Sequence, residues 1–531
     1  MRDFHLPGRS PVHALNGMAA TSHPLASVTA IGMLKAGGNA VDAALAAAFV
    51  LGLAEPPMCG IGGDCFVLLK PAGSDTVIGL NGSGRAPAGL SAETLRASGH
   101  ARMPLHGIHP VTLPGAIDAF CRLHEDHGCL PLDRILAPAI RHAEDGVPVA
   151  ARVAFDWADD LPVLQGHARE VYSFQGRAPH MGEVFRNPGQ AEVLRRIARE
   201  GRKGFYEGEV AEDIVASLRA LGGTHTLDDL AATACDYTQP IAGAYGNLEL
   251  LEHPPNGQGA TAILMLNILR HFDLKALPPF GPQRAHLEAE AAKLAYDARD
   301  RFIADPAPRL DHMLSRATAD RLAALIDLDR AMPDPAPVTE RIHGGTNGAI
   351  HRDTVYLTVV DRDRMAISLI YSLFWGFGSG LASDRFGINF QNRGAGFSLV
   401  AGHPNEAAGG KRPMHTIIPG MIRRAGRVIM PFGVMGGGYQ PCGHVRFLTN
   451  IADYGLDVQA AMDAPRSFAG PEAMEVERGY SDTTRAALAQ MGHAVSIPAT
   501  PLGGSQAILI GGDGVLTGGS DPRKDGCALG Y

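Results

Sequence analysis

Cysteine is scarce in this sequence: seven occur among 531 residues, and no two have the CxxC spacing. An odd, scattered set predicts neither a disulfide framework nor a zinc site, so we expect no metal and no other cofactor. Basic residues are fewer than acidic ones, 47 against 55. The resulting net charge of −8, without a basic block, argues against nucleic acid or an anionic membrane surface as a partner.

Long apolar runs are missing as well. The first 17 residues contain Arg2, Asp3, His5 and Arg9 and no hydrophobic core of signal-peptide length, which predicts a cytoplasmic protein. The apolar stretch 43–51 is too short to cross a bilayer, because a transmembrane helix needs about 20 residues. We therefore expect no membrane-spanning segment.

The rest of the composition is ordinary for a globular protein, with 45% hydrophobic and 19% charged residues. The chain is long enough for several domains or one large layered one. Residues 27–35 and 43–51 predict helices, and 65–70 predict a strand. The glycine cluster 60–63 between helix and strand has the order opposite to a dinucleotide fingerprint, so we expect it to pack backbone against backbone.

The stretch 351–361 is the one around which we organise the chain. A glycine-rich loop runs into a β-branched and aromatic run, Thr354–Val360, and a polar turn separates it from a second apolar run, 365–374. This pattern predicts a hairpin of two buried strands. Thr354 lies where the loop becomes strand, and a threonine there is by itself only a good strand former.

Other segments are assigned by the same reasoning. Residues 111–330 are mostly helical by pattern, and the proline-rich stretch 332–337 predicts a linker. A strand is expected near Ile417 and another over 428–432, the latter ending in the glycines 436–438.

Four motifs occur in one order along the chain: Asp-Thr-Val-Tyr-Leu-Thr-Val-Val-Asp at 353–361, Gly-Phe-Gly-Ser-Gly at 376–380, Lys-Arg-Pro at 411–413 and Gly-Gly-Gly at 436–438. Together with the stretch 37–66 they resemble the γ-glutamyltranspeptidases, a family of N-terminal-nucleophile hydrolases. The resemblance spans nearly the whole chain. It implies an α/β (α+β) fold: a four-layer αββα sandwich of two antiparallel sheets between helices, with extra helices in the N-terminal segment.

In that family a precursor cuts itself just before the threonine that matches Thr354. The resemblance implies scission between Asp353 and Thr354, giving a large segment 1–353 and a small segment 354–531 that form one intertwined domain. A hydroxyl is a poor nucleophile without a base, whereas a free α-amino group has a pKa of about 7.7 to 8.0 and is partly deprotonated at neutral pH. Scission would therefore give Thr354 its own base.

The resemblance also implies roles for other residues. Ser372 matches a second hydroxyl residue of the family site, and Gly436 and Gly437 match an oxyanion hole. Consecutive glycines can turn their N–H groups to one point, although they can also simply line a helix start. Arg85 precedes an Ala-Pro similar to that of relatives whose arginine binds the substrate carboxylate, but its register is shifted. A substrate clamp and a solvated loop arginine both stay open for it.

The sequence departs from the family where glutathione-using members hold the substrate's amino acid part. Phe374 stands in place of a substrate-binding Asn, Gly396 in place of an Asp that grips the amino group, and His415 and Thr416 in place of paired serines. Each lost charge-assisted contact is worth about 1.5 to 3 kcal/mol. Arg393 and His415 would instead favour an anionic group without a free ammonium.

From these observations we expect a self-processing threonine-nucleophile γ-glutamyltransferase or hydrolase, of the glutathione hydrolase kind, acting on a small amide through an acyl-enzyme. An amidohydrolase of a non-glutamyl substrate, such as oxamate or an acyl-amide, is the alternative. A silent relative that only binds carboxylates, and a serine hydrolase of another type, are further alternatives, although no Gly-x-Ser-x-Gly elbow is visible. The expected partners are the small amide and the two segments of one precursor, and a homo-oligomer is compatible with the resemblance.

Overall fold

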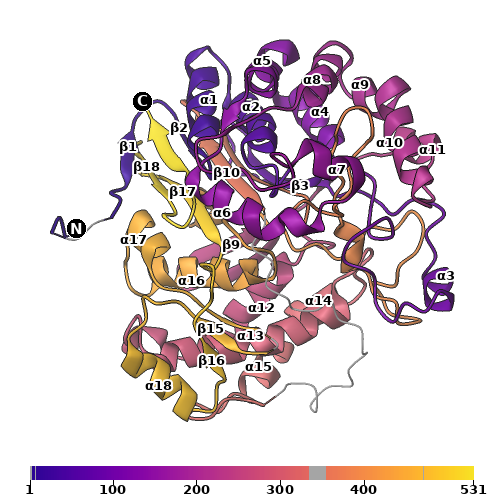
Figure 1. Ribbon diagram of the computed structural model, residues 1–531. Coiled ribbons are helices and arrows are strands. Elements are labelled where there is room, and N and C mark those ends of the chain that lie inside the picture. Colours follow the sequence, from indigo (N-terminus) through magenta and orange to yellow (C-terminus); the bar gives the residue numbers. More distant parts are fainter. Residues whose placement is uncertain (1–2, 6–7, 334–353, 471) are drawn as a thin grey trace.

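The computed structural model describes residues 3–5, 8–333, 354–470 and 472–531. Within these residues two seven-stranded antiparallel sheets form the centre of the molecule (Figure 1). The first sheet has the spatial order β1 (Val12–Ala14), β18 (Leu516–Ser520), β17 (Gly504–Ile510), β13 (Arg427–Met435), β12 (Gly420–Arg424), β9 (Leu248–Glu252) and β8 (Ile241–Tyr245). The second has the order β19 (Cys527–Gly530), β2 (Met18–Thr21), β10 (Val355–Val360), β11 (Ala366–Ser372), β3 (Asp64–Lys70), β4 (Ile78–Gly82) and β7 (Asp236–Thr238).

Helices cover the outer face of each sheet. The second sheet is covered by α1 (Pro24–Lys35), α2 (Ala40–Ala54) and α4 (Ala116–His127), on which α5 (Leu132–Asp145) and α8 (Pro188–Glu200) pack. The first sheet is covered by α12 (Gly259–Leu269), α16 (Gln440–Ala452) and α17 (Val458–Asp463), and α13 (Pro282–Phe302) packs on α12. Figure 1 shows the two groups of helices on opposite sides of the strands. The predicted four-layer sandwich is confirmed.

Smaller elements surround these layers. The remaining helices are α3 (Ala92–Ala97), α6 (Ala151–Asp160), α7 (Gly166–Val171), α9 (Lys203–Tyr206), α10 (Gly208–Ala220), α11 (Leu227–Ala231), α14 (Leu310–Leu314), α15 (Arg316–Ala323) and α18 (Asp482–Gln490). Short strands β5 (Val147–Pro148), β6 (Val184–Phe185), β14 (Ser467–Ala469), β15 (Met474–Val476) and β16 (Val495–Ser496) form two small sheets. In the part of the chain that is described, every helix is too short or too polar to cross a membrane.

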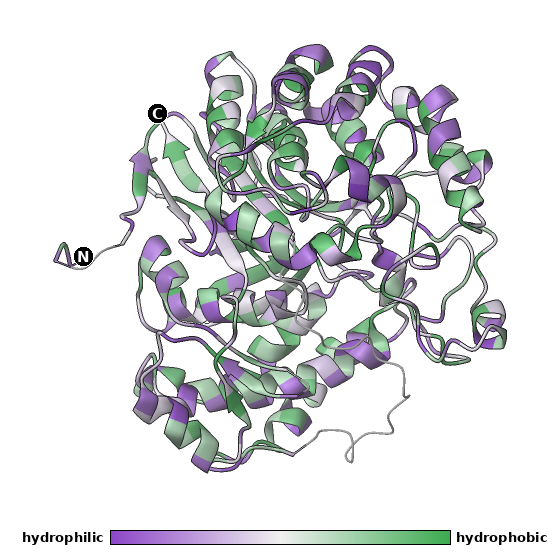
Figure 2. Ribbon diagram, viewed as in Figure 1, coloured by the Kyte–Doolittle hydropathy of each residue, from purple (hydrophilic) through white to green (hydrophobic). Residues whose placement is uncertain are grey.

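The central hairpin forms where the sequence predicted it. β10 and β11 pair in antiparallel register, with Val355 opposite Tyr371 and Val360 opposite Ala366. Successive side chains of the hairpin point into two different cores. Val355 belongs to the core shared with helix α2, whereas Tyr356 and Ile370 pack between the two sheets. Both faces of the hairpin are covered, so nearly every position is apolar. Figure 2 shows this concentration of hydrophobic residues in the central strands and in α2.

The glycine loop before β3 packs backbone against backbone, as expected. A β-carbon on Gly62 would lie 2.1 Å from the carbonyl oxygen of Asn389, and one on Gly63 would lie 2.5 Å from that of Ser372. Neither position has room for a side chain. The loop therefore holds the start of β3 against the end of β11.

The strand expected near Ile417 begins later, at Gly420. The preceding backbone is bonded to side chains instead of to a neighbouring strand: Thr416 O accepts a hydrogen bond from Gln258, and Ile418 N donates one to Gln440. Because these side chains come from distant parts of the chain, local β-propensity could not reveal the later start.

Candidate active site

Three polar side chains lie side by side at one end of the second sheet. The β11–β3 register places Ser372 opposite Asp64, and Thr354 immediately precedes β10 beside Ser372. The Thr354 hydroxyl donates a hydrogen bond of 3.2 Å to Ser372 Oγ. All three residues are fully buried, and the alternation along their strands turns them towards the first sheet.

The backbone at Thr354 is unusual. Its φ is +132°, a region that residues with a β-carbon rarely adopt. Ser372 Oγ also accepts a hydrogen bond of 2.8 Å from the amide of Phe374, which holds this hydroxyl in place beneath Thr354. Asp353, the residue before the predicted scission point, lies outside the described residues.

The glycine loop after β13 lies at the same end of the sandwich. Along β11, Ser368 donates a hydrogen bond of 3.2 Å to Phe432 O, and further along Ile370 packs with Met435. The two strands therefore run in parallel directions across the core, and the end of β11 at Ser372 meets the end of β13 just before Gly436.

Gly436 and Gly437 have the geometry of an anion-binding turn. Their φ angles are +111° and +51°, and both residues are buried. Among the described residues, neither glycine donates its amide N–H to a backbone carbonyl outside its own helix or strand. Buried N–H groups left without a partner are costly unless a ligand accepts from them, so the turn is suited to a developing negative charge.

Arg393 is a buried cation beside these groups. Its Nη1 donates a hydrogen bond of 2.9 Å to Thr416 Oγ1, and its guanidinium lies 4.2 Å from the ring centre of Phe374. Burial lowers the pKa of Arg393 to about 9, and the nearby carboxylate of Asp64 opposes this effect. Its Nε and Nη2 have no hydrogen-bond partner among the described residues. Buried donors of this kind point to a missing acceptor, such as a carboxylate.

Asp64 is the site residue that sequence reasoning missed. Its carboxylate accepts hydrogen bonds from Gly84 N at 2.8 Å, Gly115 N at 3.1 Å and Gln391 Nε2 at 2.8 Å. Burial raises its pKa to about 6, although Arg393 and these hydrogen bonds oppose the shift. An acidic residue at the start of an otherwise apolar strand was the one available signal.

His415 joins this cluster through Asp64. Its Nε2 lies 3.2 Å from Asp64 Oδ2. Burial, with Arg393 nearby, lowers the pKa of His415 well below its usual value, so the ring is neutral. An ionised carboxylate only accepts, and therefore Nε2 carries the proton and Nδ1 is a bare acceptor. This Nδ1 is buried without a partner among the described residues.

Arg85 lies apart from this group. Its side chain is 41% exposed and forms ion pairs with Asp236 at 3.6 Å and Asp305 at 3.5 Å. It also donates a hydrogen bond of 3.1 Å to Gly410 O. The structure thus brings Thr354, Ser372, Arg393, His415, Thr416 and the glycine turn together, while the Arg85 side chain is paired with Asp236 and Asp305, and its role as a substrate clamp stays a prediction.

The two departures from the family pattern are connected in space. A β-carbon on Gly396 would lie 2.5 Å from Met414 O, so the backbone here leaves no space for an aspartate. Phe374, with a φ of +88°, covers the guanidinium of Arg393. At the two positions where the resemblance implies an ammonium grip, the structure thus has a ring beside the Arg393 guanidinium and a backbone without room for a side chain.

One further group has metal-ligand chemistry. Ligand atoms of His286, Glu290 and His493 lie within 4.8 Å of one another, and all three residues are buried. Protein groups already engage them: His286 Nδ1 and His493 Nε2 are 2.8 Å apart, and Lys293 Nζ donates to Glu290 at 2.6 Å. The trio belongs to α13 and the loop after α18, and none of the predicted site residues takes part in it.

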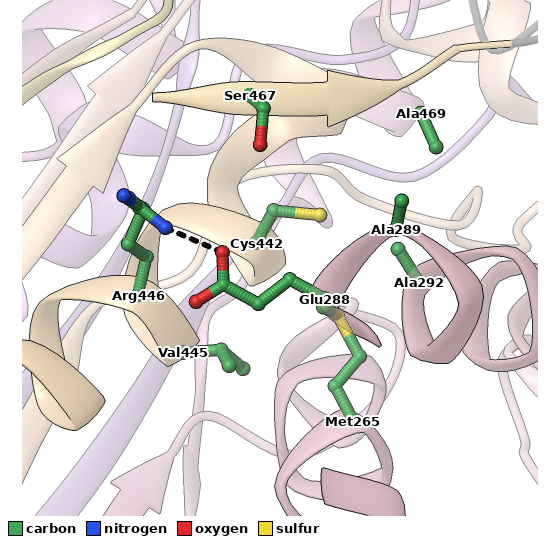
Figure 3. Close-up of a pocket in the computed structure, with 9 residues that line it drawn as sticks. All are labelled: Met265, Glu288, Ala289, Ala292, Cys442, Val445, Arg446, Ser467 and Ala469. Atoms are coloured by element: carbon green, nitrogen blue, oxygen red, sulfur yellow. Dashed lines mark hydrogen bonds and ion pairs between the residues drawn. The ribbon is translucent and has the colours of Figure 1, made fainter. Parts of the chain in front are cut away.

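A small cavity lies between α13, α16 and β14 (Figure 3). Its volume of about 10 Å³ is room for one water. Glu288 and Arg446 form an ion pair at its wall, and burial raises the pKa of the Cys442 thiol to about 12. A thiol that stays protonated is a poor nucleophile, so this cavity does not compete with the Thr354 cluster as a reactive site.

The cluster has the parts needed for acyl transfer. A hydroxyl stands next to a second hydroxyl, a buried glycine turn is suited to an oxyanion, and a buried arginine has two donors for an anion. Gln258 connects the last two parts, because its Nε2 donates to both Thr416 O and Gly437 O.

Comparisons with known proteins agree with this chemistry. A family model described as Gamma-glutamyltranspeptidase matches residues 26–531. The chain is 34% identical over 528 residues to the glutathione hydrolase-like YwrD proenzyme of Bacillus subtilis (strain 168), covering 97% of this chain and 98% of the relative. It is also 34% identical over 536 residues to the oxamate amidohydrolase proenzyme of Klebsiella pneumoniae, with the same coverage. The crystal structure of cephalosporin acylase from Bacillus halodurans superposes with a TM-score of 0.90 at 37% identity, covering 100% of this chain and 99% of the other.

Proposed function

Because this chain belongs to the γ-glutamyltranspeptidase family of N-terminal-nucleophile hydrolases, we propose that it is a self-processing amidase whose nucleophile is Thr354. The observation that carries the proposal is the position of Thr354: buried, at a φ of +132°, with its hydroxyl 3.2 Å from Ser372 Oγ. Backbone strain of this kind persists only where the surroundings enforce it, and it gathers at functional sites. Scission before Thr354 would relieve it.

Processing and turnover use the same hydroxyl. In processing, Thr354 Oγ attacks the carbonyl carbon of Asp353, the C–N bond breaks to leave an ester, and water hydrolyses it to a free carboxylate and a free amine. In turnover, Oγ attacks the substrate amide while its proton passes to the new α-amine. That proton then goes to the departing amine, and water or an acceptor amine takes the acyl group. Gly436 and Gly437 N–H groups stabilise the oxyanion in each tetrahedral intermediate.

The substrate is a small amide. Relatives of similar identity are named as glutathione hydrolases, an oxamate amidohydrolase and acylases, and thus both glutamyl and non-glutamyl donors belong to the proposal. The unpartnered donors of Arg393 and the lack of space at Gly396 favour a donor that carries a carboxylate and no ammonium. We propose that the carboxylate pairs with Arg393 Nε and Nη2, because two parallel donors match two carboxylate oxygens.

A denaturing gel tests the nucleophile. Wild-type protein is expected to give two bands that correspond to 1–353 and 354–531, whereas Thr354→Ala stays one chain without amide turnover. N-terminal sequencing of the smaller band should begin at Thr354. A Thr354→Ala chain that still splits, or an intact wild-type chain that hydrolyses amides, would sink the proposal.

A donor panel tests the substrate class. Oxamate, acyl-amides with a carboxylate, acyl-amides without one, and γ-glutamyl amides are compared on the processed enzyme. Arg393→Met should raise KM for carboxylate-bearing donors by about 10-fold to 150-fold, the loss of a charge-assisted contact of about 1.5 to 3 kcal/mol. KM for uncharged donors should barely change. Equal effects on charged and uncharged donors would show that Arg393 supports the fold instead of the substrate.

A further inference from the structure

Gln258 lies between the two parts of the site, and its side-chain NH₂ donates both of its hydrogen bonds there. It is fully buried just before α12, and its Nε2 donates to Thr416 O at 2.6 Å and to Gly437 O at 2.9 Å. Its own amide N–H donates to His415 O at 2.9 Å. One residue therefore links the backbone of the substrate-binding segment to the backbone of the glycine turn.

Arg299 sets the orientation of this side chain. Its Nη1 donates a hydrogen bond of 3.0 Å to Gln258 Oε1. A guanidinium has no acceptor and a backbone carbonyl has no proton, so the amide has one arrangement that satisfies every partner. Arg299 is itself held by Asp300 at 2.7 Å and by the ring of Tyr296, whose centre lies 4.6 Å away. The chain of contacts starts on α13, which carries all three of these residues.

The carbonyl groups of the glycine turn are held one by one. Gly436 O accepts from Tyr439 N at 2.9 Å, Gly437 O accepts from Gln440 N within the short 3-10 turn and from the Gln258 side chain, and Gly438 O accepts from the Tyr296 hydroxyl. In a trans peptide the C=O of one residue and the N–H of the next share a plane and point in opposite directions, so holding Gly436 O sets the Gly437 N–H and holding Gly437 O sets the peptide plane that follows Gly437. Gln258 thus constrains Gly437, whose φ of +51° only glycine adopts readily.

We propose that Gln258, oriented by Arg299, is a positioning residue: it fixes the peptide plane after Gly437 and so restrains the turn that offers the Gly436 and Gly437 N–H groups to the oxyanion. The inference rests on the function proposed above and adds a residue that does not touch the reacting atoms. Oxyanion donors act only when they lie about 2.7 to 3.1 Å from the oxygen in the transition state. A loosened turn should therefore weaken transition-state binding and leave the ground state nearly unchanged.

The kinetic test compares Gln258→Met with a matched control at another buried glutamine. Gln258→Met keeps the volume and removes the amide, and it is expected to lower kcat about 10-fold to 100-fold with KM within about threefold of wild type. Gln459→Met is the control: this buried glutamine donates to Ser520 O at 3.0 Å and to Asp463 at 2.9 Å, away from the turn. Its kcat should equal that of wild type. A Gln258→Met enzyme with wild-type kcat, or one changed only in KM, would overturn the inference.

A titratable variant separates positioning from simple support of the fold. In Gln258→Glu an ionised carboxylate cannot donate to either carbonyl, whereas the protonated acid can donate to one. The ratio of variant to wild-type kcat should rise as the pH falls, with the fold unchanged by circular dichroism. A ratio that stays flat from pH 5 to pH 8 would contradict a hydrogen-bonding role.

A third measurement does not need amide turnover. Hydrogen exchange is followed by mass spectrometry on a peptide that covers 433–442, with Gln258→Met introduced into wild type and into Thr354→Ala. Faster exchange of the turn amides in both backgrounds supports the inference, even if the enzyme hydrolyses none of the donors. The lack of hydrolysis would count only against the proposed function. Unchanged exchange in both backgrounds overturns the inference whatever the activity.

Discussion

At the scale of single residues, two buried serines on β11 have different partners, and comparing them distinguishes a catalytic contact from a structural one. Ser372 accepts from Thr354 Oγ1 at 3.2 Å, while Ser368, on the same face of β11, donates to Phe432 O at 3.2 Å. Removing the Ser372 hydroxyl costs about 1 kcal/mol of interaction with the nucleophile. We expect Ser372→Ala to lower kcat about fivefold to tenfold.

Ser368→Ala is the matched control. It should lower the free energy of unfolding by about 1 to 3 kcal/mol, through the bonds lost to Phe432 O and to the buried Tyr356 hydroxyl, and leave kcat within about twofold of wild type. Steady-state kinetics and thermal unfolding on both variants provide the comparison. If both variants lost kcat equally, the contact between Ser372 and Thr354 would have no special part in the chemistry.

Asp64 gives the site a pH dependence. Burial raises its pKa to about 6, so its charge offsets that of Arg393 above pH 6 and is lost below it. A substrate carboxylate, with a pKa of about 4, stays ionised at pH 5. It then meets a more positive cluster, and KM for an anionic donor should fall from pH 7 to pH 5. The raised pKa also makes the folded state less favoured as the pH rises from about 4 to about 6, because the unfolded chain releases this proton more readily.

Asp64→Asn tests this assignment. The amide keeps an oxygen for Gly84 N and Gly115 N and removes the charge. KM should then be low and flat between pH 5 and pH 7. The measurement is KM for one anionic donor across that range in both proteins. A variant that keeps the wild-type pH profile would show that another group titrates.

The glycine turn is the decisive feature at the scale of structural elements. A β-carbon on Gly436 would lie 2.9 Å from Gly503 Cα, and the φ of +111° disfavours any side chain there. Gly438 has open space for a β-carbon. We expect Gly436→Ala to displace the turn and lower kcat about 10²-fold to 10³-fold, the usual effect of losing an oxyanion donor.

Gly438→Ala is the control within the same turn and should stay within about threefold of wild-type kcat, because its β-carbon would meet nothing within 4 Å. Kinetics on processed protein measure both effects. Near-wild-type activity in Gly436→Ala would remove the turn from the mechanism.

Helix α13 connects the site to the segment before the proposed scission point. Near its end, Tyr296 and Arg299 hold the glycine turn through Gly438 O and Gln258. Near its middle, Glu290 accepts a hydrogen bond of 2.8 Å from Met332 N, and Lys293 donates one of 2.8 Å to Met332 O. The same helix therefore contacts both the catalytic backbone and the last described residues before Thr354.

At the scale of the whole molecule, each sheet contains strands from both sides of residue 354. β10 lies between β2 and β11, and β13 pairs with β12 and β17 in a sheet that also contains β8 and β9. Breaking one peptide bond leaves these ladders intact. We expect processed protein to elute as one species in native size-exclusion chromatography and to unfold in one cooperative transition.

The two segments should separate only in denaturant. Analysis of the native peak on a denaturing gel should show both bands in equal amounts. Elution of 354–531 alone from a native column would mean that the two segments do not share a core after scission.

Local patterns predicted much of this protein. The β-branched runs of 354–360 and 365–374 specify a hairpin whichever helices cover it, and Gly436 and Gly437 mark a turn because other residues rarely adopt a positive φ. The motif order predicted the four-layer fold. The hairpin and the turn depend on residues that are adjacent in the chain, and these can be read directly from the sequence.

The arrangement of the pocket was decided by tertiary structure. Asp64 meets His415 across 351 positions, and Arg85, which the sequence allowed as a substrate clamp, pairs with Asp236 and Asp305. Contacts between residues so far apart in the chain cannot be predicted from the periodicity of the sequence, because they form only when the two sheets pack together. The sequence by itself therefore determined the fold and the nucleophile we propose, while only the folded sandwich decided which charges surround that nucleophile.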